Sequence, residues 1–160
     1  MGTIRVVWGA ATGQTAMASY DAALAGANVH DYNLVQVSSV IPAGASLEVA
    51  DEAPGLGPAG QRLTVVQSRD TVAPAADRPA VAGIGWARSA DRGPGIFYEA
   101  AGGTAAAVRE EIEAGLDHGT SLRDWTVAER QTEVRATDDD AEAFTTQVVC
   151  AVYGDADPIV

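Results

Sequence analysis

Two adjacent hydroxyl side chains, Ser38 and Ser39, lie near the end of an apolar, β-branched stretch that runs from about Tyr32 to Val40 and closes at Pro42. In a strained and buried Ser-Ser peptide, the second hydroxyl can attack the preceding carbonyl carbon. The resulting ester can eliminate to dehydroalanine and hydrolyse to an N-terminal pyruvoyl group. The alternative is two small hydroxyl side chains at a strand end, and the spacing alone does not decide between them.

Two carboxylates occupy apolar surroundings. Asp21 has Met17 four residues before it and Leu24 three residues after it in a predicted helix, which places it on the predicted apolar face. A buried carboxylate needs a partner, and we expect either an arginine of this chain or a cationic substrate. Glu99 follows the apolar residues 95–98. It is either a solvated acid at a strand end or an acid whose pKa is raised by burial among these neighbours.

Composition excludes several classes of function. The chain has 22 acidic residues and a net charge of -12, and all 10 basic residues are Arg. The absence of Lys excludes pyridoxal phosphate held on a lysine of this chain. The negative charge argues against nucleic acid and anionic membrane surfaces as partners, and it is typical of proteins from salt-loving organisms. The apolar stretches are too short to span a bilayer. The single cysteine, Cys150, gives no disulfide or metal-ligand spacing, so we expect no metal and a cytoplasmic location.

The pattern of apolar and turn-forming residues predicts a single domain, residues 1–160, with two helices among several strands. The helices are expected from the N-cap Thr15 to Gly26 and from Thr104 to Gly119. Residues 9–13 are expected to form a turn and residues 42–61 an exposed loop. Strands are expected near residues 3–8, 32–40, 62–72, 81–87, 96–100, 125–134 and 144–153. This order predicts an α+β or layered α/β domain with helices over sheet faces.

Several blocks of the sequence, in their order and spacing, resemble the pyruvoyl-dependent arginine decarboxylases. The blocks are Gly13-Gln14-Thr15, residues 21–25, residues 33–42, and Tyr98-Glu99 followed by Gly102. The most specific block begins at Asn33, contains Ser38-Ser39 and ends at Pro42. The resemblance covers nearly the whole chain. Residues 43–60 have little that matches, and Ala101 stands where some relatives carry a second acid.

The resemblance implies a layered αββα sandwich that assembles into trimers with active sites between neighbouring subunits. It implies autocatalytic cleavage between Ser38 and Ser39 into a β chain, residues 1–38, and an α chain, residues 39–160. Ser39 would become the covalent pyruvoyl group that replaces pyridoxal phosphate, and the reaction would convert L-arginine to agmatine and carbon dioxide.

The resemblance also implies roles for three further side chains. Asp21 would bind the guanidinium group of arginine, and Glu99 would protonate the carbon atom that loses carbon dioxide. Asn33 would assist self-cleavage, although a hydrogen bond to backbone at the strand start is an open alternative. Two other functions also stay open: a pyruvoyl-dependent decarboxylase of another amino acid, and an unprocessed binding or regulatory subunit.

Overall fold

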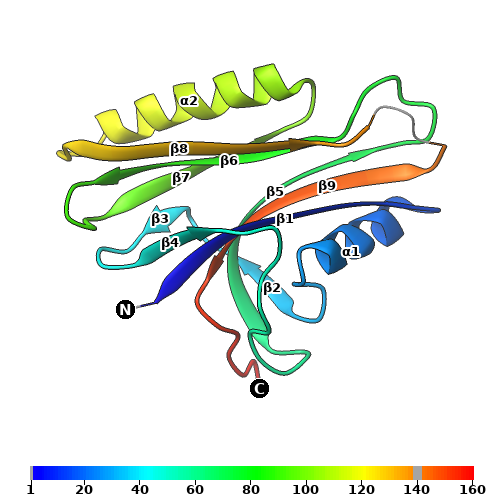
Figure 1. Ribbon diagram of the computed structural model, residues 1–160, viewed down its shortest axis with the longest axis horizontal. Helices are drawn as coiled ribbons and strands as arrows, with labels where there is room; N and C mark the ends of the chain where they lie inside the picture. Colours follow the sequence, from blue (N-terminus) through cyan, green and yellow to red (C-terminus); the bar gives the residue numbers. More distant parts are fainter. Residues whose placement is uncertain (1, 139–141) are drawn as a thin grey trace.

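The computed structural model describes residues 2–138 and 142–160. Two β-sheets pack face to face, and one helix covers the outer face of each sheet (Figure 1). The elements in chain order are β1 (Thr3–Gly13), α1 (Ala16–Gly26), β2 (Asn33–Gln36), β3 (Val40–Ile41), β4 (Ser46–Val49), β5 (Arg62–Val72), β6 (Val81–Ser89), β7 (Gly95–Ala101), α2 (Ala105–Ser121), β8 (Val127–Ala136) and β9 (Phe144–Tyr153).

The first sheet, called sheet A below, has the strand order β2-β5-β9-β1-β4, and sheet B has the order β3-β7-β6-β8. Helix α1 packs on β1 and β9 of sheet A, whereas α2 packs on β6, β7 and β8 of sheet B. The layers are therefore helix, sheet, sheet and helix (Figure 1). This arrangement confirms the predicted α+β fold with a layered αββα sandwich.

Apolar side chains fill the space between each pair of layers. The space between the two sheets contains the largest of them, including Trp86 and Phe97, whose rings meet edge to face with centroids 6.1 Å apart. Under α2 the core includes Val108, Ile112 and Leu116, which are the residues that repeat every four positions along that helix. Because both sheets contribute to one shared layer, side chains in this layer have fixed neighbours on both sides.

Strand β1 is longer than expected, and the predicted turn at residues 9–13 is wrong. These residues continue β1, which pairs with β9 as far as Gly13 opposite Phe144. Glycine is needed here for close packing rather than for a turn: a Cβ atom on Gly9 would lie 2.1 Å from the carbonyl oxygen of Ala23 in α1. Only small residues on α1 can approach β1 this closely.

The single strand predicted for residues 32–40 is also wrong, because the chain changes sheets within it. Strand β2 pairs in parallel with β5 in sheet A, whereas β3 pairs antiparallel with β7 in sheet B. Residues 37–39, called the crossing segment below, connect the two strands. A uniform run of β-branched residues predicts extended backbone but does not show that the chain leaves one sheet for another.

The remaining elements are close to the prediction. Helix α1 begins after Thr15, whose side chain accepts a hydrogen bond from the backbone N–H of Ala18 at 3.0 Å, as the N-cap pattern predicts. Helix α2 does not end at Gly119 but continues two residues further, to Ser121. A Cβ atom on Gly119 would lie 2.5 Å from Cδ1 of Ile96, so glycine at this position allows close packing. The predicted loop of residues 42–61 contains β4, which pairs in parallel with β1.

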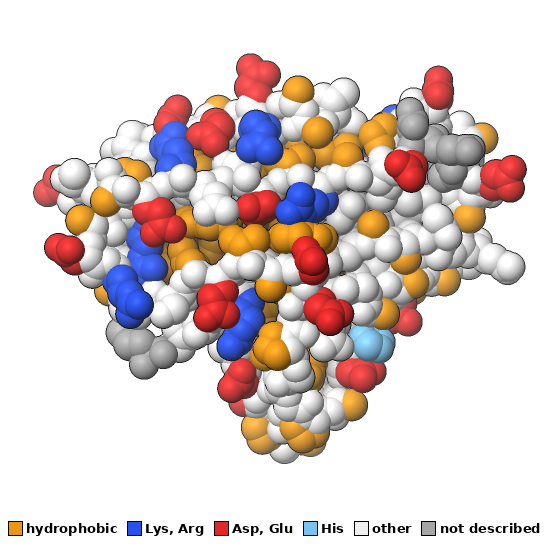
Figure 2. Space-filling view, in the orientation of Figure 1, with side chains coloured by type: hydrophobic (Ala, Val, Ile, Leu, Met, Phe, Trp, Pro, Cys, Tyr) orange, Lys and Arg blue, Asp and Glu red, His pale blue; other side chains and the backbone are white. Residues whose placement is uncertain are grey.

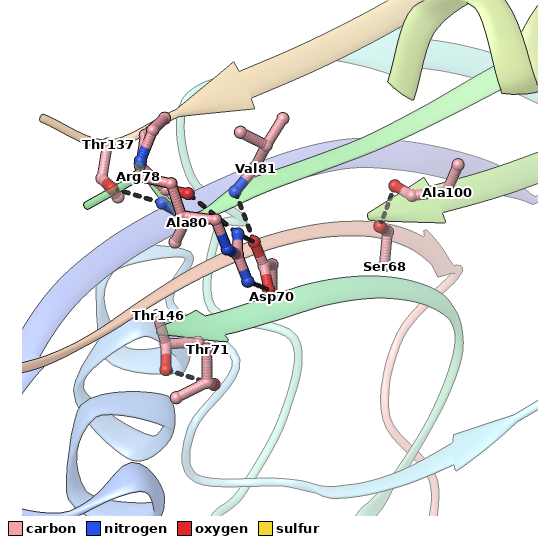
Figure 3. Close-up of polar contacts among 10 residues, drawn as sticks. Ser68, Asp70, Thr71, Arg78, Ala80, Val81, Ala100, Thr137 and Thr146 are labelled. Atoms are coloured by element: carbon pink, nitrogen blue, oxygen red, sulfur yellow. Dashed lines mark hydrogen bonds and ion pairs between the residues drawn. The ribbon is translucent and has the colours of Figure 1, made fainter. Parts of the chain in front are cut away.

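A second connection between the sheets, residues 73–80, joins β5 to β6. Asp70, near the end of β5, accepts two hydrogen bonds from Arg78, at 2.6 and 3.1 Å, and one from the backbone N–H of Val81 at 3.0 Å (Figure 3). The side chain of Asp70 is only 10% exposed. This charge-assisted fork fixes the start of β6 relative to the end of β5.

Charged side chains are distributed over the surface. Figure 2 shows acidic and arginine side chains scattered over one face, with a band of hydrophobic side chains across part of its middle. No helix in the described part of the chain is long and apolar enough to cross a membrane.

Cleavage in the crossing segment should leave the two pieces associated. Strand β1, in residues 1–38, lies between β9 and β4, and it pairs with β9 from Ile4 to Gly13. We expect both pieces to co-elute in gel filtration under native conditions and to separate only in denaturant. The uncut Ser39→Ala chain, which lacks the attacking hydroxyl, should elute at the same volume. Release of residues 1–38 in native buffer would contradict this arrangement.

Candidate active site

Ser39 has a strained backbone conformation in the crossing segment. Its φ angle is +62°, in the left-handed region that costs a residue with a side chain about 1–2 kcal/mol. This angle describes rotation about the bond from the nitrogen of the Ser38–Ser39 peptide to the Cα atom of Ser39. The carbonyl group on the C-terminal side of the Ser39 Cα atom is also held, because its oxygen accepts a hydrogen bond from the backbone N–H of Phe97 at 2.8 Å.

Glu99 lies beside the side chain of Ser39. The hydroxyl of Ser39 donates a hydrogen bond to Oε2 of Glu99 at 3.2 Å, although the two residues are 60 positions apart in the chain. Alternation along β7 puts Glu99 on the same side of the strand as Phe97, which faces the layer between the sheets. The structure therefore brings together the second serine and the acid that the sequence singled out.

Of the two alternatives for Glu99, the single chain has the solvated one, because this residue is exposed. The reason is the shortness of β3, which pairs only with Gly95 and Ile96 of β7. Within the part of the chain that the structure describes, β6 is the only strand that neighbours Glu99, through the pair with Ile84. The opposite edge of β7 is therefore open beside the acid.

Two hollows meet at Glu99. One, of about 340 Å³, is lined by Ser39, Phe97, Tyr98 and Glu99. The other, of about 370 Å³, lies between β5 and β7 and is lined by Tyr20, Gln36, Gln67, Ser68, Arg69, Glu99, Ala100 and Ala101. A small amino acid can be accommodated in a space of this size. Much of the second wall consists of polar side chains that sequence analysis did not identify.

Ser68 fixes the position of β7 at the site. Its hydroxyl donates to the carbonyl oxygen of Ala100 at 2.7 Å, as Figure 3 shows, and accepts from the backbone N–H of Gly83 at 3.2 Å. Ser68 is on sheet A, whereas Ala100 is on sheet B and directly follows Glu99. This buried hydroxyl therefore holds the two sheets together next to the acid. No spacing in the sequence relates Ser68 to Glu99.

A partly buried polar network adjoins the larger hollow. The hydroxyl of Tyr20 and the side-chain amide of Gln67 contact each other at 2.9 and 3.0 Å, and the amide also contacts the sulfur of Cys150 at 3.8 Å. Burial raises the pKa of the Cys150 thiol to about 12, with a smaller opposing effect of the hydrogen bond from Gln67. The thiol stays protonated near neutral pH. The guanidinium of Arg69 lies 4.3 Å from the centre of the Tyr20 ring.

Tyr153 reaches the site from the end of β9. Its hydroxyl donates a hydrogen bond to the carbonyl oxygen of Val40 at 2.8 Å, and its ring meets Phe97 edge to face with centroids 6.2 Å apart. Burial, and to a smaller extent the negative charge of Glu99, raise the pKa of Tyr153 above its ordinary value. The phenol therefore remains a proton donor across the neutral range. Sequence analysis did not identify this residue.

Asp21 does not occupy the apolar face that its neighbours predict. Helix α1 contacts sheet A through Leu24 and the small side chains of Ser19 and Ala23, while Asp21 is exposed and Met17 is 70% exposed. The predicted face is wrong because the close approach of β1 favours small residues: Ser19 is fully buried, and its hydroxyl lies 2.7 Å from that of Thr146. Asp21 is not among the residues that line either hollow around Glu99.

Asn33 is exposed at the start of β2, and its side-chain amide donates to the carbonyl oxygen of Gly60 at 2.6 Å. This contact corresponds to the alternative of a backbone hydrogen bond at the strand start. Because β2 is extended, Asn33 lies at the opposite end of this strand from Ser38. A part for Asn33 in self-cleavage stays a prediction. Among residues 2–138 and 142–160, no group of His, Cys, Asp and Glu side chains is arranged to hold a metal ion.

Adjacent serines at the crossing between two sheets, with an acid against the second hydroxyl, fit the class of αββα enzymes expected from the sequence. Comparison with known proteins identifies the family. A family model described as pyruvoyl-dependent arginine decarboxylase matches residues 3–158. The chain belongs to this family.

Three relatives carry the same description, pyruvoyl-dependent arginine decarboxylase. Those from Halobacterium salinarum strains R1 and NRC-1 are each 46% identical to this chain over 160 residues, covering 99% of it and 98% of the relative. A relative from Pyrococcus abyssi is 32% identical over 122 residues, covering 75% of each chain. The enzyme is therefore a decarboxylase, and its cofactor is a covalent pyruvoyl group rather than pyridoxal phosphate.

The left-handed conformation of Ser39 can be tested by comparing two variants that cannot cut themselves. Glycine adopts positive φ angles without strain, so we expect Ser39→Gly to be about 1 kcal/mol more stable than Ser39→Ala, or about 2–4 °C higher in melting temperature. Differential scanning calorimetry measures this difference.

Position 38 provides the control, because its φ angle is not positive. On the Ser39→Ala background, Ser38→Gly should be less stable than Ser38→Ala, since glycine there only adds freedom to the unfolded chain. Equal stability of the two variants at position 39 would show that Ser39 is not strained in solution.

Proposed function

We propose that this chain cuts itself between Ser38 and Ser39 and that the pyruvoyl group formed from Ser39 decarboxylates L-arginine to agmatine. One observation carries the proposal: Ser39 combines a left-handed backbone with a hydroxyl directed at Glu99. Family membership supplies the cofactor and the substrate class. The cut pieces would be the β chain, residues 1–38, and the α chain, residues 39–160.

Self-cleavage would proceed through atoms that this chain supplies. The hydroxyl oxygen of Ser39 bonds to the carbonyl carbon of Ser38, and the peptide bond between them breaks to leave an ester and a free amine. Elimination then removes the proton from the Cα atom of residue 39 and breaks its Cβ–O bond, which releases the carboxylate of Ser38 and leaves dehydroalanine. The amine of dehydroalanine rearranges to an imine. Water hydrolyses the imine, which releases ammonia and leaves a ketone. Strain at Ser39 favours the first step because the cut relieves it.

The residues around Ser39 fit a pyruvoyl group at this position. When formed, the group supplies the carbonyl that reacts with the substrate amine and withdraws electrons as carbon dioxide leaves. The hollow beside Ser39 gives a substrate access to it, and Glu99 is within hydrogen-bond distance of the side chain of residue 39. We assign to Glu99 the delivery of a proton to the carbon atom that has lost carbon dioxide.

Binding of the substrate guanidinium is assigned to Asp21, whose exposed carboxylate can form a charge-assisted pair. Because Asp21 lies outside the hollows of its own chain, we propose that subunits assemble, as trimers, with each active site completed by a neighbour. Exposed apolar side chains around the crossing segment support such a contact: Val35, Val37 and Val40 are 40%, 41% and 48% exposed.

We also propose a part for Asn33 in self-cleavage and a cytoplasmic location. The side-chain amide of Asn33 donates to Gly60 at the start of β2, so Asn33 would assist self-cleavage by positioning β2 rather than by direct contact within its own subunit. A cytoplasmic location agrees with a buried free thiol, Cys150, of raised pKa.

A product assay tests the function. Purified, cut protein in concentrated salt should release agmatine and carbon dioxide from arginine, and should act more slowly on lysine, ornithine and histidine. The Ser39→Ala chain should stay in one piece and give no product. Faster turnover of another amino acid by the wild type would contradict the assignment of arginine.

Replacing Glu99 by Gln should separate cleavage from turnover. The amide oxygen of Gln still accepts the Ser39 hydroxyl, so self-cleavage should continue, but an amide cannot deliver a proton. We expect kcat to fall about 100-fold or more, with activity expressed per pyruvoyl group titrated with phenylhydrazine. An unchanged kcat would remove Glu99 as the proton donor.

Replacing Asp21 by Asn should weaken arginine binding without affecting self-cleavage. Loss of a charge-assisted hydrogen bond predicts a rise in KM of about tenfold or more, measured by steady-state kinetics on fully cut protein. Glu110→Gln, on the exposed side of α2, changes the net charge equally and should leave KM unchanged. If both variants have the wild-type KM, Asp21 does not bind the substrate.

A further inference from the structure

Tyr153 is the last residue of β9 in sheet A, but its hydroxyl contacts sheet B. Its backbone pairs with Ile4 of β1, whereas its hydroxyl donates to the carbonyl oxygen of Val40 in β3 at 2.8 Å. Val40 is the residue immediately after Ser39. The phenol therefore spans the layer between the sheets and ends one residue from the proposed cleavage site.

Two successive carbonyl groups at this site are held by hydrogen bonds. The carbonyl of Ser39 accepts from the backbone N–H of Phe97 at 2.8 Å, and the carbonyl of Val40 accepts from Tyr153. Fixing both carbonyl groups fixes the two peptide planes on either side of the Val40 Cα atom. The first of these planes begins at the Cα atom of Ser39, so its orientation determines where the reacting atoms of residue 39 lie relative to Glu99.

The ring of Tyr153 and its hydroxyl have separate functions in this arrangement. The ring packs edge to face on Phe97, a contact that phenylalanine would preserve. The hydroxyl contacts neither Ser39 nor Glu99 in the hydrogen bonds of the described residues, and its partner is a backbone carbonyl. Its one direct contact near the cleavage site is therefore the carbonyl of Val40, and the charge of Glu99 acts on it only from a distance.

We propose that Tyr153 is a positioning residue for both self-cleavage and turnover: by holding the carbonyl of Val40, its hydroxyl keeps residue 39 in place against Glu99. This inference rests on the proposed cut between Ser38 and Ser39. In the uncut chain the contact maintains the strained conformation of Ser39. In the cut enzyme it anchors the N-terminal residue of the α chain, which no longer has a preceding residue to restrain it.

The test is Tyr153→Phe, which removes the hydroxyl and keeps the ring. Chain made by cell-free synthesis is sampled over time on a denaturing gel, and the half-time of cleavage is compared with the wild type. Loss of one hydrogen bond predicts cleavage about three to ten times slower. In fully cut protein, kcat should fall by a similar factor with KM for arginine unchanged, because Tyr153 does not contact the substrate.

Tyr32→Phe is the matched control. The hydroxyl of Tyr32 also donates to a backbone carbonyl, that of Gly57 at 3.1 Å, and accepts from the N–H of Leu56 at 3.0 Å. This variant loses at least as many hydrogen bonds, so its melting temperature should fall at least as far, while its cleavage half-time stays that of the wild type. A purely structural function of Tyr153 predicts that the two variants cleave alike.

A second pair keeps the proposal testable if Tyr153→Phe folds poorly. Gln and Leu have similar volumes, but only Gln can donate to the carbonyl of Val40, so Tyr153→Gln should cleave faster than Tyr153→Leu. Wild-type cleavage and kcat in a folded Tyr153→Phe, or equal rates in the Gln and Leu variants, would overturn the inference. A wild-type chain that never cuts would instead overturn the proposed function.

Discussion

The chain must pass from one sheet to the other within residues 37–39, and the rest of the site depends on this short crossing. Strand β2 is paired with β5 up to Gln36, and β3 is already paired with β7 at Val40. Three residues leave little freedom for relaxation, so the turn is concentrated at Ser39, whose φ angle is +62°. The same crossing directs the Ser39 hydroxyl toward Glu99 on β7.

The position of the crossing also explains how the fold can tolerate a break there. Every strand of sheet B follows residue 39, whereas sheet A combines β1 and β2 with strands from the rest of the chain. A cut at this point therefore divides sheet A between two pieces without removing a strand from sheet B. The new N-terminal residue would stay attached to β7 through the N–H of Phe97. Strain can thus be released locally while the surrounding layers stay packed.

Much of the fold followed from the sequence, since both helices and the long strands have clear periodicity and caps. The errors occurred where packing between elements decides the structure. Gly9 to Gly13 form strand rather than turn because α1 packs directly on them, and Asp21 is exposed because α1 uses small residues against the sheet. The proximity of Ser39 and Glu99 was expected only from resemblance. Ser68 and Tyr153 were missed because their contacts cross between sheets and have no sequence spacing.

The mass of freshly purified, full-length protein, measured under denaturing conditions after synthesis in concentrated salt, tests the central claim most directly. The account predicts two species, residues 1–38 with an ordinary carboxyl terminus and residues 39–160 whose first residue carries a ketone in place of the serine amine. Reduction with borohydride should add two hydrogen atoms to the larger species only. A single intact chain of 16.4 kDa that is unchanged by borohydride would contradict the account.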